Sequence, residues 1–206
     1  IFIILLVLVS VAMVIATISL NQLRLEFNLR TTSQALQQQT IALEKSNYKL
    51  NQLALTDFLT GLKNVRFFDS EYKKRWENST TSGTPLSIIL LDVDCFKLYN
   101  DSLGHLAGDE CLKRIGEVLL TYPGFHRGLV ARIGGEEFAI VMENNAEQAL
   151  EEAERIVAIV EHLSIPHPSS LVGASVTVTA GVATRSSLDS SREKLLSRAD
   201  YALYHA

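Results

Sequence analysis

The sequence predicts a mixed α/β domain of the α+β kind, preceded by a long helical segment. Three observations lead to this prediction. Residues 1–20 are apolar and uncharged, and residues 21–58 contain neither proline nor glycine. After them, short β-branched runs alternate with segments of helical periodicity. The 206 residues suffice for one domain of ordinary size with a remainder, so we expect a single folded domain at residues 56–206.

The first element is the apolar stretch "IFIILLVLVSVAMVIATISL", residues 1–20. About 20 residues rising 1.5 Å each match a hydrocarbon core of about 30 Å, so this stretch predicts a transmembrane helix. The alternatives are a core helix or a signal peptide, and the latter would have a basic start and a shorter apolar run. The chain opens on Ile1 instead of Met, so we expect its start to be a cut. Arg24 and Arg30 follow closely, which predicts a domain on the cytoplasmic side of the inner membrane.

The second element, residues 21–55, is predicted to be a helical linker. One heptad seam is apolar and its companion is largely polar; the seams are Leu29, Leu36, Leu43, Leu50 and Leu25, Thr32, Gln39, Ser46, Leu53. One good seam gives at most a weak coiled coil, so a solvated spacer and a weakly dimeric signalling helix both stay open. The net charge of −4 without a basic stripe argues against nucleic acid. Cys95 and Cys111 have no metal-ligand spacing and are expected to be free thiols.

The globular part reads as alternating strands and helices. The expected elements are a helix from about residue 65, a strand at 86–94, a helix at 108–121, strands "LVARI" and "FAIVME", a helix at 146–162, a strand "ASVTVTAGVAT", and a helix from 192. The middle elements follow the order β-α-β-β-α-β, which predicts a ferredoxin-like antiparallel sheet with helices on one face. Many unrelated functions use this plan, so function must come from particular residues.

The stretch "RIGGEEFAI" places two glycines and two glutamates between the adjacent strands. We expect the glycines to form a hairpin turn at positive φ and to leave Glu136 and Glu137 at the sheet's edge. Asp92 and Asp94 end the preceding strand, with the carbonyl of Val93 between them. Like charges this close raise a pKa or bind a cation. Asp92 with Glu136 or Glu137 is therefore predicted to hold Mg²⁺, a metal common in phosphoryl and nucleotidyl transfer.

These residues carry a resemblance to the GGDEF family of diguanylate cyclases. "GGEEF" resembles its signature, and "DFLTGLKN" resembles its D-x-L-T-G-L-x-N opening. "DVDCFKLYNDSLGHLAGD" is similar to its D-x-D-x-F-K-x-x-N-D-x-x-G-H-x-x-G-D stretch at every signature position, and "RADYALYHA" to its closing helix. The resemblance covers roughly residues 55–206 and implies a palm domain of the nucleotidyl-cyclase kind.

The resemblance implies synthesis of cyclic di-GMP and pyrophosphate from two GTP molecules, one held by each domain of a homodimer. It assigns Asp92, the Val93 carbonyl and Glu136 to Mg²⁺. Glu137 would assist as a further acidic group. Glu136 is favoured over Glu137 as general base for the ribose 3′-hydroxyl, although the sequence does not separate these two roles.

The remaining implied site residues bind substrate. Asn100 and Asp109 would read guanine, with His105 nearby, because a carboxylate can accept from guanine N1–H and N2–H. Phe96 and Lys97 would lie against the triphosphate, where a backbone turn and a cation both favour anions.

Other polar residues in these motifs have simpler explanations. We expect Asp57 and Asn64 to be turn and helix-cap residues, because their side chains suit local bonding to the backbone. Asp101 is expected to brace a turn. His105 alone would be assigned a structural role, and only its place in G-H-x-x-G-D gives it a function.

Three departures from the family pattern carry predictions. The inhibitory product site R-x-x-D is replaced by "FHRG", with Phe125 and Gly128 at the charged positions, so product inhibition is expected to be absent. Val65 replaces the first arginine of N-R-R, so one surface ion pair is expected to be absent and the chemistry to be unaffected. The chain stops at Ala206, before the A-K-x-x-G-R-N segment whose lysine and arginine grip phosphate, so we expect the fragment to be poorly active.

Three alternative functions stay open at this point. A degenerate domain could bind GTP or cyclic di-GMP and regulate a partner, but such domains usually lose the hairpin acids. A membrane scaffold would leave Asn100, His105 and Asp109 unexplained. A cyclase acting on one nucleotide would differ at Asp109 and in its need for a dimer. The sequence does not identify the input signal, since any sensor domain would precede Ile1.

Overall fold

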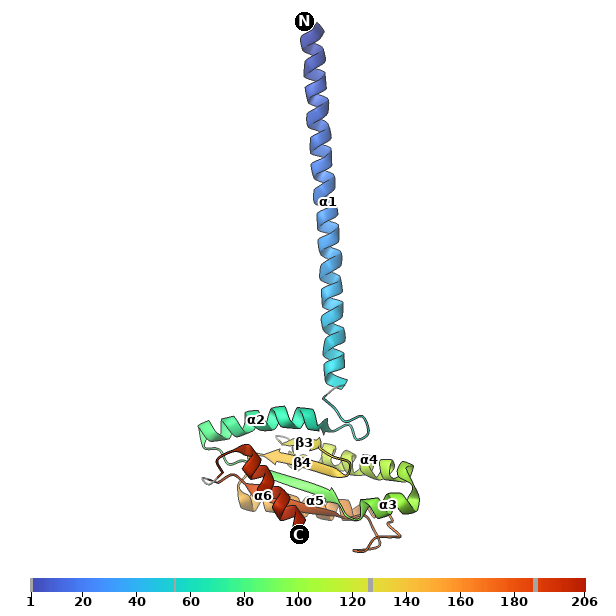
Figure 1. Cartoon of the computed structure of the whole chain (residues 1–206), viewed down its shortest axis with the longest axis vertical. Coiled ribbons are helices and arrows are strands. Elements are labelled where there is room, and N and C mark those ends of the chain that lie inside the picture. Colours follow the sequence, from blue (N-terminus) through green and yellow to red (C-terminus); the bar gives the residue numbers. More distant parts are fainter. Residues whose placement is uncertain (1, 54, 126–127, 187–188) are drawn as a thin grey trace. The chain divides into compact units, whose positions relative to one another are not determined.

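The computed structural model describes residues 2–53, 55–125, 128–186 and 189–206. It divides into two compact units, residues 1–51 and 52–206. Helix α1 (Phe2–Leu53) makes up the first unit and ends two residues beyond it; it is the long helix expected from a stretch without proline or glycine (Figure 1). Leu29, Leu36 and Leu43 are exposed along α1. Both the spacer and the dimer interpretations of this helix remain predictions.

Within the described part of the chain, we find no helix with the length and apolar character required to cross a membrane. The transmembrane segment was predicted for residues 1–20. Most of its side chains lie outside the described residues.

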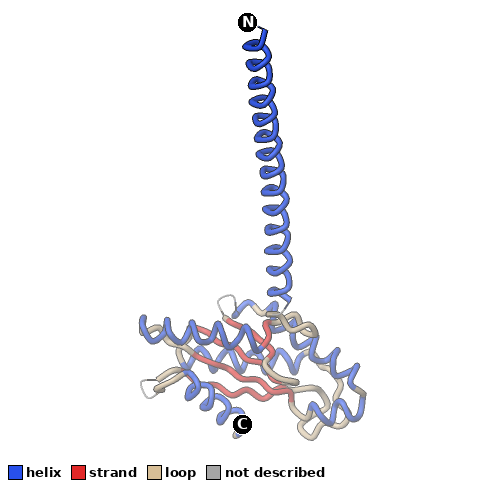
Figure 2. Tube along the Cα trace, turned by 45° about the horizontal axis from the view of Figure 1, so that its top comes forward, coloured by secondary structure: helices blue, strands red, loops and turns tan. Residues whose placement is uncertain are grey.

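The second unit is built on one five-stranded sheet, drawn in red in Figure 2. Its strands are β1 (Lys63–Asn64), β2 (Ser87–Val93), β3 (Leu129–Arg132), β4 (Glu137–Met142) and β5 (Val178–Thr184). They lie in the order β1-β3-β4-β2-β5, with β1 parallel to β3 and all other pairs antiparallel. The predicted β-α-β-β-α-β order is present from β2 to β5. Strand β1, only two residues long, was not predicted.

The helices of this unit are α2 (Val65–Ser82), α3 (Phe96–Leu103), α4 (His105–Thr121), α5 (Ala146–His162) and α6 (Arg192–Tyr204), with a 3₁₀ turn η1 (Pro123–Phe125). Local sequence signals determine where several of these helices begin or end. The Asn64 side chain accepts from the Phe67 amide at the start of α2, as predicted, and Gly83 ends that helix at φ 74°. Asn145 and Gln148 form a capping box on α5. Helix α3 was not expected, and α4 begins three residues before its predicted start.

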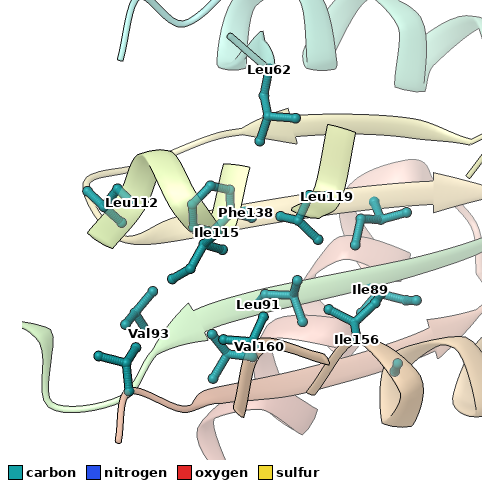
Figure 3. Packing of buried hydrophobic residues seen from close by; sticks show 14 of the residues in the cluster. Leu62, Ile89, Leu91, Val93, Leu112, Ile115, Leu119, Phe138, Ile156 and Val160 are labelled. Atoms are coloured by element: carbon teal, nitrogen blue, oxygen red, sulfur yellow. The ribbon is translucent and has the colours of Figure 1, made fainter. Parts of the chain in front are cut away.

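The helices cover both faces of the sheet, which corrects the prediction of one covered face. Strand β2 sends Ile89, Leu91 and Val93 into a core with α4 and α5, shown in Figure 3. It sends Ile88 and Leu90 into a second core with α2 and α6. The reason is visible in β2 itself, because a strand with two buried faces is apolar without alternation.

Candidate active site

The predicted acidic residues lie together at one end of two neighbouring internal strands, where β2 ends and β4 begins. Asp92 and Glu137 are register partners in the antiparallel pair, and Leu91 opposes Phe138. Glu136 directly precedes β4 and is half-buried, whereas Glu137 is exposed. The expectation that the first long strand and the hairpin are neighbours is therefore confirmed, and it brings Asp92, Glu136 and Glu137 together.

The Asp92 carboxyl is the perturbed member of this group. Burial, followed by the charges of Glu136, Glu137 and Asp94, raises the pKa of Asp92 to about 6 from an ordinary value of 3.8. Within the described residues, no hydrogen bond or ion pair reaches its carboxylate. The fold thus places the Asp92 carboxylate next to other carboxylates, and no cation from the described part of the chain compensates it.

Two of these carboxylates and one backbone oxygen are the groups that could hold a divalent cation. No cluster of three or more His, Cys, Asp or Glu side chains close enough for a metal occurs among the residues described. Asp92, Glu136 and the Val93 carbonyl nevertheless form an all-oxygen donor set. Such a set suits Mg²⁺, which typically takes one or two carboxylates and completes its shell with water and phosphate. Because a cation would relieve the repulsion around Asp92, these residues fit the ion.

Asp94 differs from Asp92 although it lies only two residues further on. Its carboxylate accepts hydrogen bonds from the hydroxyls of Thr177 at 2.5 Å and Thr179 at 2.6 Å. Its backbone N–H donates to the Thr177 carbonyl at 3.0 Å. Asp94 is therefore a structural residue that ties the end of β2 to β5.

A turn and the short helix α3 follow Asp94. Cys95 has φ 56° and begins α3 without a side-chain cap. Phe96 is buried and its ring stacks on Tyr99 at 6.0 Å between centroids, so its side chain is part of the core and only its backbone is left for the predicted phosphate contact. Lys97 is exposed on the first turn of α3 and remains available to an anion.

The residues predicted to read guanine lie on α3 and α4. Asn100 is partly buried, and its Oδ1 atom has no hydrogen-bond partner among the described residues. A Cβ on Gly108 would collide with this oxygen, so the glycine leaves room for the amide. Asp109 follows on the exposed surface of α4, and His105 is exposed at its start. A buried acceptor without a partner is a site where a ligand donor is favourable.

Arg132 is the residue that the sequence interpretation missed. Its guanidinium pairs with Asp57, 3.1 Å from Oδ1 and 3.3 Å from Oδ2, and also donates to the Gly135 carbonyl at 2.6 Å. Thr60 donates its amide and hydroxyl to Asp57, which confirms Asp57 as a turn residue. Burial alone would raise the pKa of Asp57, but the Thr60 hydrogen bonds and Arg132 outweigh it and hold that pKa below its ordinary value. An arginine two residues before the glycines was the available signal.

The hairpin glycines do not act as predicted. Among the described residues, the glycines at positive φ are Gly61, Gly83 and Gly104, so neither Gly134 nor Gly135 uses that freedom. A Cβ on Gly134 would instead collide with the Glu137 side chain. Gly134 thus leaves room for the side chain of Glu137, which any larger residue at position 134 would displace.

Apolar packing occupies the positions of the family's inhibitory site. Phe125 is buried, with its ring 4.8 Å from that of Tyr122 and inclined by 62°. The Gly128 amide donates to the Phe125 carbonyl at 2.8 Å. His126 and Arg127 lie outside the described residues. Val65, the other departure, is an exposed residue at the start of α2.

A protein-family model described as "Diguanylate cyclase, GGDEF domain" matches residues 54–206. The chain is 37% identical over 160 residues to the response regulator PleD of Caulobacter vibrioides, with 75% of this chain and 34% of the relative covered. It is 34% identical over 163 residues to diguanylate cyclase DgcZ of Escherichia coli K12, with 77% and 53% covered. The chain thus spans between a third and about half of these relatives.

The chain is also similar to solved structures of GGDEF domains. The coiled coil and GGDEF domain of DgcB from Caulobacter crescentus, in complex with c-di-GMP, is similar with a TM-score of 0.75 and 28% identity. That match covers 85% of this chain and 92% of the DgcB chain. The active GGEEF domain of a diguanylate cyclase from Vibrio cholerae is similar with a TM-score of 0.60 and 31% identity, covering 69% and 89%.

Proposed function

The chain belongs to the GGDEF family of diguanylate cyclase domains, and we propose that it condenses two GTP molecules into cyclic di-GMP. Two pyrophosphates are released in the reaction. The observation that carries the proposal is the meeting of Asp92, Glu136 and Glu137 at one end of the strands, where no described residue pairs a cation with Asp92. A purely structural pair of strand ends would gain nothing from this repulsion.

Guanine recognition falls to α3 and α4. The unpartnered Oδ1 of Asn100 can accept a hydrogen bond from the base, and the exposed carboxylate of Asp109 can accept from N1–H and N2–H. Adenine offers no such pair of donors, so GTP is favoured over ATP. His105 lies four residues before Asp109, at the start of the same helix.

Glu136 is proposed to take the proton from the ribose 3′-hydroxyl of one GTP. The freed oxygen attacks the α-phosphorus of the second GTP, a new P–O bond forms, and the bond to the β-phosphate oxygen breaks. Repeating this transfer in the other direction closes the ring and releases the second pyrophosphate. Because each domain holds one GTP, the reaction requires two facing copies, and we propose a homodimer.

Mg²⁺ is the proposed cofactor, held by Asp92, the Val93 carbonyl and Glu136. When bound, it would neutralise the negative charge that develops on the triphosphate. The contribution of this chain is to keep Asp92 unpaired and partly buried, so that its carboxylate is available to a ligand. Glu137 adds negative charge at the same strand ends, and Lys97 supplies a positive charge for the phosphates.

The chain is further proposed to be anchored in the inner membrane by residues 1–20, with the catalytic domain in the cytoplasm. The support is the uncharged apolar sequence of that segment and the arginines Arg24 and Arg30 that follow it. The linker of residues 21–55 would join two copies weakly through its apolar seam.

The proposal is tested by incubating the whole chain, in detergent micelles, with GTP and Mg²⁺ and separating the products by chromatography. We expect slow but measurable formation of cyclic di-GMP and pyrophosphate, with ATP giving no equivalent product. Equal turnover of ATP would contradict the guanine assignment. GTP bound tightly but never converted would favour the regulatory alternative, a degenerate nucleotide-binding domain.

A further inference from the structure

The loop between α5 and β5 contacts the turn that precedes α3, and the reaction outlined above assigns it no role. Pro166 and Ser175 form an isolated antiparallel bridge within it. The His167 amide donates to the Ala174 carbonyl at 2.9 Å, and the Val176 amide donates to the Ile165 carbonyl at 2.8 Å. The loop is therefore an ordered hairpin-like extension that leads directly into β5.

Its only buried titratable side chain among the described residues is His167, which is 1% exposed. The Nε2 atom lies 3.2 Å from the Cys95 carbonyl oxygen, and the ring meets Tyr99 edge to face at 5.1 Å. Nδ1 has no hydrogen-bond partner within the described residues. A carbonyl oxygen can only accept, so Nε2 carries the proton and donates to Cys95.

The acceptor of this bond is a strained residue. Cys95 carries a Cβ yet has φ 56°, in the left-handed region that such residues seldom adopt. Its carbonyl already accepts the Tyr99 amide at 3.1 Å, and its own side chain gives α3 no cap. Backbone of this kind persists when surrounding contacts hold it in place. His167 supplies such a contact from 72 residues away.

The same segment holds the turn from its other side. Thr177 and Thr179 donate their hydroxyls to the Asp94 carboxylate, and the Asp94 amide donates to the Thr177 carbonyl. Residues 94 and 95 are thus fixed by hydrogen bonds from one continuous stretch, residues 167–179. They lie between Val93, a proposed metal ligand, and Lys97, proposed to face phosphate.

We propose that His167 is a positioning residue for the nucleotide-binding turn, acting through the Nε2–H bond to the Cys95 carbonyl. The bond fixes the direction of the peptide between Cys95 and Phe96, and so presets the backbone that meets the triphosphate. This role rests on the proposed function for its catalytic consequence. The fixing of the turn itself does not depend on that function.

The test compares two variants of the whole chain. His167→Leu keeps an apolar side chain of similar reach and removes the donor, whereas His167→Gln retains an amide N–H in place of Nε2–H. His162→Leu is the matched control, because His162 is exposed on α5 and its ring bonds, among the described residues, to the Ala158 carbonyl of its own helix. The measurements are kcat and KM for GTP, and amide hydrogen exchange of residues 93–99 without nucleotide.

We expect His167→Leu to raise KM for GTP about tenfold, with a smaller change in kcat, since a misplacement of about 1 Å can cost about 10²-fold and the loss of one hydrogen bond moves the turn less than that. Exchange of the turn amides should quicken about tenfold, because the turn opens more often. His167→Gln should recover both quantities to within about threefold, and His162→Leu should match the unaltered chain.

Unchanged exchange in His167→Leu would overturn the proposal whatever the activity shows. Equal impairment in the Leu and Gln variants would overturn it too, because packing against Tyr99 would then explain the effect. A chain that makes no cyclic di-GMP, yet shows the expected exchange pattern, would refute the proposed function and leave the positioning of the turn supported.

Discussion

Two groups of residues that contain carboxylates flank the same hairpin. The carboxylate of one group is paired with a cation, and those of the other group lie next to each other. The Asp57 brace comprises Asp57, Thr60, Arg132 and the Gly135 carbonyl, whereas the Asp92 cluster comprises Asp92, Glu136 and Glu137. In the brace, a guanidinium and two hydrogen bonds hold the pKa of Asp57 low. In the cluster, burial and neighbouring carboxylates raise the pKa of Asp92 to about 6.

The difference separates structural from functional charge. A partly buried carboxylate that serves the fold is paired, because an unpaired one lowers stability. One that serves a ligand is left unpaired until the ligand arrives, and perturbed pKa values of this kind concentrate at functional sites. Asp94 supports the rule, since it lies beside the cluster but is satisfied by Thr177 and Thr179 and belongs with the structural group.

The largest expected effect comes from neutralising a charge of the cluster. Glu136→Gln keeps the shape of the side chain but removes the proposed base and metal ligand. Turnover of GTP should fall by at least ~10², the usual loss for a positioned acid–base group. The unfolding free energy of the apo protein should stay the same or rise by about 1 kcal/mol at most, because repulsion among the carboxylates is relieved. Its melting temperature should therefore stay the same or rise.

Glu161→Gln, at an exposed position of α5, is the control for Glu136→Gln and should change neither quantity. Clear destabilisation by Glu136→Gln with near-normal specific activity would mean that Glu136 has a structural role. The distinction between the brace and the cluster would then fail.

The brace should show the reverse pattern, with a loss of stability. Arg132→Met keeps most of the side chain's apolar stem and leaves Asp57 without its cation. The two partners are 13% and 16% exposed, so we expect the unfolding free energy to fall by about 2 kcal/mol in chemical denaturation.

Lys113→Met is the control for the brace, because Lys113 pairs with Glu110 where the two side chains are 46% and 66% exposed. It should cost less than about 0.5 kcal/mol. Equal losses in Arg132→Met and Lys113→Met would mean that the brace is an ordinary surface pair.

The two groups should also respond to pH with opposite signs. The folded-state pKa of Asp92 is raised, so its contribution to stability is full below about pH 4 and is lost as pH rises through about 6. Asp92→Asn should therefore stabilise the apo chain above pH 6 by about 1 kcal/mol, after allowance for solvent screening, and make no difference at pH 3.5.

Asp57 has a depressed folded-state pKa, so its contribution is present above about pH 4 and is lost as pH falls below that value. Asp57→Asn should lower stability at pH 7 and have no effect in strong acid. Melting curves of both variants between pH 3 and pH 8 measure the two trends. Parallel pH profiles for Asp57→Asn and Asp92→Asn would break the distinction between brace and cluster.

The smallest effect is expected where charge is missing altogether. Phe125 and Gly128 offer no cation or carboxylate to a second nucleotide, so cyclic di-GMP should not bind outside the active site. Calorimetry on the Glu136→Gln chain, with GTP occupying the active site, should detect no heat from added product. Micromolar binding there would show that uncharged packing can replace the ion pairs of the family's inhibitory site.

Part of this molecule could be predicted from local sequence. The order of the long strands, the Asn64 cap and the hairpin carrying Glu136 follow from periodicity and from side chains that bond to their own neighbourhood. The meeting of Asp92 with the hairpin also follows, because strand order and antiparallel register fix which ends coincide. Each of these features depends on contacts within a few residues or on a regular repeat.

Other features were decided only by tertiary packing. Asp57 and Arg132 are 75 residues apart, His167 and Cys95 are 72 residues apart, and no spacing rule connects either pair. Both faces of β2 are covered because α2 and α6 pack against the face of the sheet that was predicted to have no helices. Asp92 and Asp94 look alike in the sequence and differ in the fold, because Thr177, just before the neighbouring strand β5, and Thr179, within it, reach one carboxylate and not the other. Whether a charge is paired depends on which groups surround it in space, and that is settled when distant segments pack together.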